Sequence, residues 1–304
     1  MRNDVLRSLA YALIPLGVLI LAASLACVLA YVACQFFSDC ALAKVIDKIT
    51  QALLVLSIFP AMMVLKIKRK ALGFAVRTIF LKQLVLGFLL GIITLLPVFA
   101  VLYGLQISVI DQTQPWTVLW CVQKSAVALG LALLISLIEE PLFRGLLLLS
   151  FRRSISVLAA VGLSAGYYAV LHFLKTTTVI PEAERSFSSG FQLLWMAFGN
   201  VLNPDIFSAL LALVMVGIFL AFIRINYPAS LGVCIGCHTG WVWLIKMNKS
   251  FFNTDFTAEY AFLVSPYDGV IGYLVAAWLA VVILFFVSVR MQAKKRKQPQ
   301  LRLS

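Results

Sequence analysis

Apolar residues form eight long runs along the chain, and short polar or basic segments separate them. The runs cover residues 9–35, 50–66, 83–105, 120–150, 155–174, 206–223, 227–246 and 269–290. A helix of about 18 residues, at 1.5 Å per residue, crosses the roughly 30 Å hydrocarbon core of a bilayer. Helices satisfy their own backbone hydrogen bonds in lipid, and the sequence does not show the roughly ten-residue alternation of an outer-membrane barrel. We therefore predict an all-α polytopic membrane helix bundle with about eight transmembrane helices.

Composition supports this interpretation. Of the 304 residues, 62% are hydrophobic and only 12% are charged, and the mean hydropathy is +1.01. Soluble globular proteins contain about 25% charged residues. We predict a single membrane domain over residues 1–304 with a basic cytoplasmic tail at 291–304. The first apolar run has no convincing cleavage site, so we interpret it as a retained helix and not as a signal peptide.

The formal net charge of +13 comes from clusters at the ends of apolar runs. The largest clusters are Lys66, Lys68, Arg69, Lys70, Arg77 and Lys82 in one loop, and Arg290, Lys294, Lys295, Arg296 and Lys297 near the end of the chain. Such clusters mark the cytoplasmic side of a membrane protein, and they do not indicate a nucleic-acid partner. The loop at 106–119 has no Lys or Arg and is expected outside. Both termini are then cytoplasmic, and the short loops favour a bacterial inner membrane.

Residues 234–238 read CIGCH, the attachment signature of a c-type haem. His238 follows Arg224 by 14 residues, which places it about 21 Å into the bilayer at helical rise. Haem attachment needs an exposed, water-accessible segment, so we predict that no haem binds. Cysteines in apolar runs usually act as small apolar residues. Cys34 and Cys40, at an outer end, either form a disulfide or remain free thiols.

Ionisable residues inside the apolar runs are few, and each costs roughly 2.5–3.5 kcal/mol to insert. Glu139, Glu140 and Arg144 lie in SLIEEPLFRG, and the chain has only two histidines, His172 and His238. Glu140 and Arg144 are four residues apart, so they share a helix face and can form an ion pair. Glu139 is rotated by about 100° and is less neutralised, so it is available as a general base. The alternative is an ion pair that only fixes helix packing.

The depth of these residues in the membrane favours a common site. Glu139 lies about 21 Å from the inner boundary counted from Arg153, and His172 lies about 24 Å from it counted from Ser156. His238 lies at about 21 Å on the same scale. We therefore predict that the carboxylate and the two imidazoles meet at one level. The alternative for each histidine alone is a satisfied polar residue between helices.

Three short motifs in this region resemble those of a known protein family. Glu139 to Arg144 match EExxxR, and Tyr168 to His172 match FxxxH with tyrosine for phenylalanine. His238 takes the first position of a third motif, a histidine followed four residues later by Asn or Asp, with Val242 at the fourth place. In their order and spacing they resemble the CAAX prenyl endopeptidase and bacteriocin-processing (CPBP, or Abi) family of intramembrane proteases. The resemblance covers about residues 120–246, which it implies to be the catalytic core.

The resemblance implies an endopeptidase that cleaves a membrane-anchored or lipidated peptide. Glu139 would be the general base, and His172 would hold and polarise the attacking water. Glu140 and Arg144 would be the supporting ion pair, and His238 would donate to the oxyanion. We expect no cofactor. The alternative is Zn²⁺ held by Glu139, His172 and His238, since two imidazoles and a carboxylate also form catalytic zinc sites.

The third motif departs from the family pattern, because Val242 stands where the family has Asn or Asp. Loss of one oxyanion donor can cost about 10²–10³ in rate. Substitute donors would have to come from Asn200, Thr239, Trp241 or Trp243. Val242 favours a second hypothesis, a catalytically silent relative that acts as an immunity or scaffold protein. A third, a transporter with a Glu/His proton relay, is disfavoured because no matching pair of broken helices appears in the other half of the chain.

Overall fold

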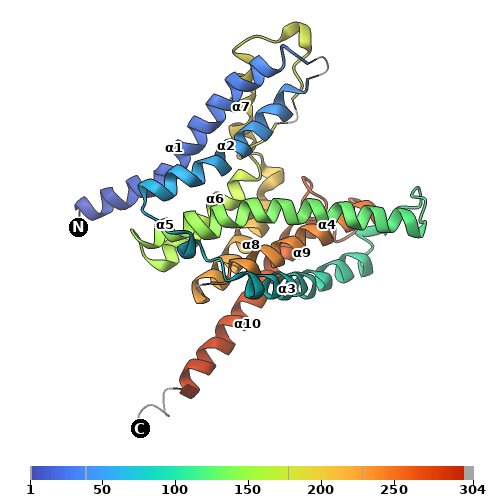
Figure 1. Ribbon diagram of the computed structural model, residues 1–304. Coiled ribbons are helices and arrows are strands. Elements are labelled where there is room, and N and C mark those ends of the chain that lie inside the picture. Colours follow the sequence, from blue (N-terminus) through green and yellow to red (C-terminus); the bar gives the residue numbers. More distant parts are fainter. Residues whose placement is uncertain (1, 38–39, 177, 228, 298–304) are drawn as a thin grey trace.

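The computed structural model describes residues 2–37, 40–176, 178–227 and 229–297, and within these ranges the chain is predominantly helical (Figure 1). The α-helices are α1 Arg2–Ala33, α2 Leu42–Val64, α3 Arg77–Gly104, α4 Val118–Glu140, α5 Leu148–Arg152, α6 Val157–Leu171, α7 Ser189–Asn200, α8 Phe207–Asn226, α9 Leu231–Phe251 and α10 Tyr273–Lys297. The predicted all-α class is confirmed.

The remaining elements are short. A π-helix, η2 Pro141–Leu147, joins α4 to α5. Four 3-10 turns are η1 Arg69–Leu72, η3 Glu182–Glu184, η4 Pro204–Ile206 and η5 Ala261–Leu263. Two strands, β1 Ser108–Ile110 and β2 Phe252–Thr254, pair antiparallel with Ser108 opposite Thr254. This ribbon links the end of α3 to the end of α9.

Six segments of the described chain are long and apolar enough to cross a membrane. They are Ala12–Ala33, Leu42–Val64, Lys70–Gly104, Val118–Arg152, Pro204–Asn226 and Tyr273–Gln292. The chain is therefore a multi-pass integral membrane protein. Helix α6, with 15 residues, is shorter than these, and α9 is not among the six, so eight crossings stay a prediction. Helix α10 continues through Lys297, so the predicted tail begins as helix and its residues 298–304 lie outside the described ranges.

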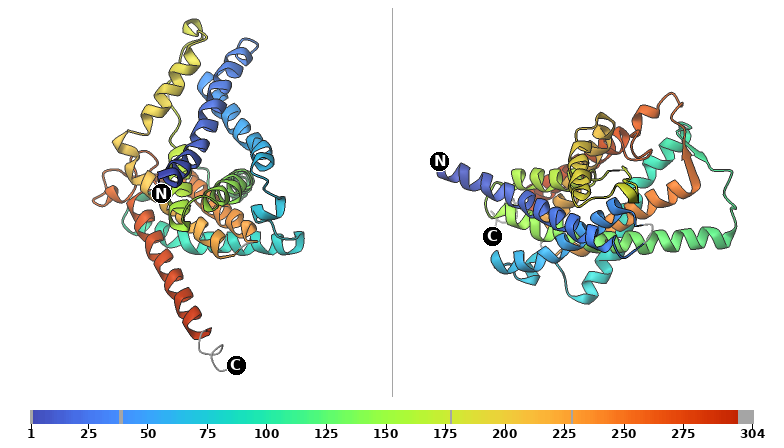
Figure 2. Two further views of the ribbon diagram at one scale, coloured as in Figure 1. Left: turned by 90° about the vertical axis from the view of Figure 1, so that its left-hand side faces the viewer. Right: turned by 90° about the horizontal axis from the view of Figure 1, so that it is seen from above.

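The helices form a central group with two projecting parts. Helices α3, α4, α6, α8 and α9 gather in the centre, while the α1–α2 hairpin and α7 extend to one side and α10 to another (Figures 1 and 2). Of the six membrane-crossing segments, the one containing α8 is the most enclosed. Its apolar side chains join those of α3, α6, α9 and α10 in the main buried cluster. The central group carries the candidate site.

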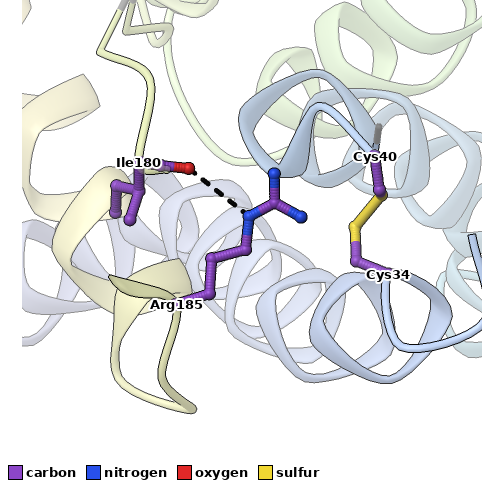
Figure 3. The surroundings of a disulfide bond; sticks show 4 residues. All are labelled: Cys34, Cys40, Ile180 and Arg185. Atoms are coloured by element: carbon purple, nitrogen blue, oxygen red, sulfur yellow. Dashed lines mark hydrogen bonds between the residues drawn. A yellow bond between two sulfur atoms is a disulfide. The ribbon is translucent and has the colours of Figure 1, made fainter. Parts of the chain in front are cut away.

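A disulfide closes the connection between α1 and α2. Cys34 and Cys40 are bonded, with their Cα atoms 5.4 Å apart, so the structure has the first of the two alternatives expected from the sequence. Arg185, from the segment before α7, lies beside this connection and donates from Nε to the carbonyl oxygen of Ile180 at 3.4 Å (Figure 3). The disulfide therefore lies where the α1–α2 hairpin meets the α7 segment.

Glycines bring α3 and α9 into close backbone contact. A Cβ atom on Gly236 would lie 2.8 Å from Phe88 N, and one on Gly240 would lie 2.7 Å from Phe88 O, where ordinary contact begins at 3.4 Å. On the facing side of α3, a Cβ atom on Gly87 would lie 2.9 Å from Cys237 N. Small residues allow this approach in membrane helices. His238 lies between Gly236 and Gly240, so this contact fixes its position.

Candidate active site

Helix α4 ends at Glu140, and Pro141 begins the π-helix. Proline has no backbone N–H to continue the α-helical ladder, and single π-turns are frequent at functional sites. The π-helix therefore follows directly after the two adjacent carboxylates.

Glu140 and Arg144 form a buried ion pair. Their side chains are 0% and 1% exposed, and Arg144 Nη1 lies 3.2 Å from Glu140 Oε1. The same Glu140 oxygen lies 2.8 Å from His238 Nδ1. The guanidinium also lies 4.3 Å from the ring centroid of Tyr168. One buried carboxylate thus holds an arginine from the π-helix and a histidine from α9.

Glu139 faces the two histidines. Its Oε2 atom lies 3.8 Å from His172 Nε2 and 3.9 Å from His238 Nε2. The Oε2 atom is buried and makes no hydrogen bond within the described part of the chain, although the side chain as a whole is 25% exposed. Both distances exceed hydrogen-bond length, and a single bridging water fits such a separation. The structure brings together the carboxylate and imidazoles that the sequence placed at one depth.

Hydrogen bonds at Nδ1 determine the tautomers of both rings. His172 Nδ1 lies 2.7 Å from the carbonyl oxygen of Tyr168, which can only accept, so Nδ1 carries the proton. His238 Nδ1 donates to Glu140, since that carboxylate is paired with Arg144. In their neutral forms both rings therefore present an unprotonated Nε2 toward Glu139. Either Nε2 can donate only when its ring is doubly protonated.

Tyr168 contacts both histidines. Its carbonyl oxygen accepts from His172, and its hydroxyl lies 3.5 Å from His238 Nε2. The residue is 2% exposed, and its ring meets Phe143 edge-on with centroids 5.1 Å apart. The sequence identified Tyr168 only as a variant of the motif phenylalanine. The hydroxyl at that position was the signal that could have revealed a polar contact.

Val242 lies one helical turn after His238 and has no polar side-chain atom. The four side chains considered as substitute donors each donate to another acceptor, at 2.7–3.2 Å. Thr239 donates to Ile235 O, Trp241 to Thr94 Oγ1, Trp243 to Ser125 O and Asn200 to Phe173 O. These four donors are bonded to other acceptors, so they do not replace the polar group that Val242 lacks.

Glu139, His172 and His238 have donor types that suit Zn²⁺, and the rings present unprotonated Nε2 atoms. However, within the described ranges no group of three or more His, Cys, Asp or Glu side chains is arranged to hold a metal ion. We therefore derive no step through a metal. The thiols of Cys234 and Cys237 are fully buried, in contrast to the exposed thiols that haem attachment requires.

Comparison with known proteins gives one family match. The model of the family described as Type II CAAX prenyl endopeptidase Rce1-like matches residues 121–244. The matched segment contains the EExxxR carboxylates and both histidines. Neither the curated proteins nor the solved structures include a match to this chain.

Proposed function

Because residues 121–244 match the family model of type II CAAX prenyl endopeptidases, we propose that this chain hydrolyses a peptide bond in a membrane-anchored or lipidated substrate by glutamate-activated water. The observation that carries the proposal is the convergence of one carboxylate oxygen and two imidazole nitrogens. Glu139 Oε2 lies within 3.9 Å of both Nε2 atoms. The partial exposure of Glu139 and His172, 25% and 31%, supports access for a water and a peptide.

In the proposed reaction, Glu139 removes one proton from the water, and the oxygen adds to the carbonyl carbon of the peptide. His172 Nε2 accepts a hydrogen bond from the same water and holds it beside Glu139. The carbonyl π electrons move to oxygen and form the oxyanion. On collapse the oxyanion electrons re-form the carbonyl, the C–N bond breaks, and the proton held by Glu139 passes to the departing amine. The second proton of the water stays on the added oxygen, so the products are a carboxylic acid and an amine.

His238 stabilises the oxyanion in this proposal. Its Nδ1 proton is held by Glu140, so Nε2 must carry a second proton to donate. Two carboxylates flank the ring, with Glu140 at 2.8 Å and Glu139 at 3.9 Å. Arg144 holds Glu140 in place through the ion pair at 3.2 Å. The buried pair thus supports the group that meets the developing charge.

We propose a metal-free reaction, with zinc as the alternative. The proposed location is a bacterial inner membrane with both termini in the cytoplasm, as the basic clusters favour. The proposed partners are the lipid bilayer and a substrate that is itself held in or at the membrane.

The test compares the termini of membrane proteins in cells that carry the wild type or Glu139→Gln at matched expression. The substitution keeps the size of the side chain and removes the base. Glu182→Gln is the matched control, because Glu182 is an exposed glutamate in the η3 turn. We expect at least one new terminus with the wild type and the control that is missing with Glu139→Gln. Identical termini in all three would refute the peptidase.

Val242 favours a second candidate function, because the family motif has Asn or Asp at this position. A silent family member would keep the buried ion pair and the helix bundle but hydrolyse nothing, and would act as an immunity or scaffold protein. In that case Glu139→Gln would support the deletion phenotype as well as the wild type does. A rescued phenotype together with unchanged termini would establish this second function.

A further inference from the structure

We propose that the hydroxyl of Tyr168 is a catalytic hydrogen-bond donor that binds the oxyanion together with His238. This inference rests on the proposed peptidase function. It concerns the residue that differs from the phenylalanine of the motif, and it supplies a donor that Val242 does not.

The geometry allows both groups to hold one oxygen atom. The Tyr168 hydroxyl lies 3.5 Å from His238 Nε2. Donors that stabilise an oxyanion lie about 2.7–3.1 Å from it, and two atoms 3.5 Å apart can both lie about 2.8 Å from a third. Because Glu139 Oε2 is 3.9 Å from the same Nε2 atom, a water held by Glu139 would lie close to this oxygen.

The protonation of His238 decides where the hydroxyl points. When the ring is neutral, the proton on Nδ1 goes to Glu140 and Nε2 can accept from the Tyr168 hydroxyl. When Nε2 is also protonated, it becomes a donor, and the hydroxyl no longer has Nε2 as an acceptor for its own proton. The hydroxyl proton is then available to the oxyanion, which is the acceptor that the reaction creates.

The ring of Tyr168 is held in place before any substrate binds. It is 2% exposed; the Arg144 guanidinium lies 4.3 Å from its centroid, and the Phe143 ring meets it edge-on with centroids 5.1 Å apart. Its backbone carbonyl also fixes His172 through Nδ1 at 2.7 Å. A donor fixed in advance costs no reorganisation during the reaction, which is the condition for effective electrostatic stabilisation.

Other neutral donors near this point are already used. Thr239, Trp241 and Trp243 on α9 each donate to another acceptor, and Val242 has no polar side-chain atom. The Tyr168 hydroxyl also has a partner, but that partner is His238 Nε2, the atom beside which the oxyanion would form. The hydroxyl therefore lies among the reacting groups of the proposed mechanism.

The test is Tyr168→Phe in the full-length protein, purified in detergent and assayed with the peptide that terminus mapping identifies. Phenylalanine keeps the ring contacts with Arg144 and Phe143 and removes only the hydroxyl. We expect kcat to fall by about 10²–10³ with KM changed less than about threefold, the range seen when one oxyanion donor is removed. A phosphinate analogue of the tetrahedral intermediate should lose affinity by a similar factor, although the substrate does not.

The matched control is Tyr167→Phe, the neighbouring tyrosine, whose hydroxyl donates to the carbonyl oxygen of Ala12 on α1 at 2.6 Å. It should leave kcat unchanged. If Glu139→Gln abolishes cleavage while Tyr168→Phe keeps kcat within threefold of wild type, the inference is wrong and the proposed function stands. If cleavage survives Glu139→Gln, the proposed function is wrong and the inference falls with it. Equal melting temperatures of the variants and the wild type would show that a loss of kcat is not caused by unfolding. If the melting temperatures differ, the affinity of the folded fraction for the phosphinate analogue decides whether Tyr168 binds the oxyanion.

Discussion

Replacing Gly236 with alanine tests whether the close contact of α3 and α9 positions His238. The new Cβ atom would lie 2.8 Å from Phe88 N and would overlap the carbonyl oxygen of Leu84, so that backbone atoms of α3 meet it on the facing side. These atoms belong to a regular helix and cannot rotate away as a side chain could. The helices must therefore separate, and His238, two residues along α9, must move with its helix.

The size of the effect follows from this overlap. The contact with Phe88 N is about 0.6 Å shorter than ordinary van der Waals contact, and the contact with the carbonyl oxygen of Leu84 is shorter still, so the helices must separate by more than about 0.6 Å. Overpacking of this kind costs about 1–3 kcal/mol in stability. A displacement near 1 Å at a catalytic group can cost about 10²-fold in rate. We therefore expect kcat to fall by about 10-fold to 100-fold and the melting temperature to fall by several degrees.

The assay measures cleavage of the identified peptide and the thermal unfolding of the purified protein. Gly130→Ala is the matched control, because Gly130 lies in α4 and a Cβ atom there meets no atom within 4 Å. Alanine stabilises a helix interior by about 1 kcal/mol relative to glycine, so the control should keep its activity and melt no lower than the wild type. If Gly236→Ala retains full kcat and the wild-type melting temperature, the contact does not position His238 and the reasoning is wrong.

Two further predictions concern the ions of the site. Glu140→Gln leaves the buried Arg144 without its counter-ion, so it should lower stability by about 3–5 kcal/mol and abolish cleavage, whereas Glu139→Gln abolishes cleavage with little effect on the melting temperature. Equal melting temperatures for the two variants would contradict the division of roles between the carboxylates. Treatment with a zinc chelator should leave the cleavage rate unchanged, and a loss of activity that added Zn²⁺ restores would replace the metal-free reaction with the zinc alternative.

The sequence predicted the helices well because apolar length is a strong signal in a membrane protein. Each of the eight predicted runs overlaps a helix of the structure, although several helices extend beyond the runs by up to eight residues, as α2 does at Leu42. The convergence of Glu139 with His172 and His238 was also predictable, since a constant rise per residue converts sequence position into depth. Sequence position gives depth only if it is known which end of each helix is cytoplasmic, and the basic clusters supplied that orientation.

Lateral position could not be predicted in the same way. Depth does not specify which neighbour a side chain faces, so the contact of His238 with Glu140, and with it the tautomer of the ring, needed the structure. The glycines of α3 and α9 recur at every fourth residue in the sequence, but the pattern alone does not name its partner helix. The π-helix depends on how the chain accommodates Pro141 within a packed bundle, and a local pattern does not distinguish it from a kink.

The π-helix Pro141–Leu147 determines how far α4 and α5, the two halves of one membrane span, are rotated relative to each other about the helix axis. A π-turn contains more residues than an α-turn, so the half that ends at Glu140 is rotated relative to the half that continues through α5. Without that extra residue, the two halves would turn by about 100° against each other. Arg144 and its neighbours would then lose their direction toward the carboxylates, or the carboxylates would turn from the histidines. Chain length across this segment is therefore as strict a requirement of the site as the identity of its charged residues.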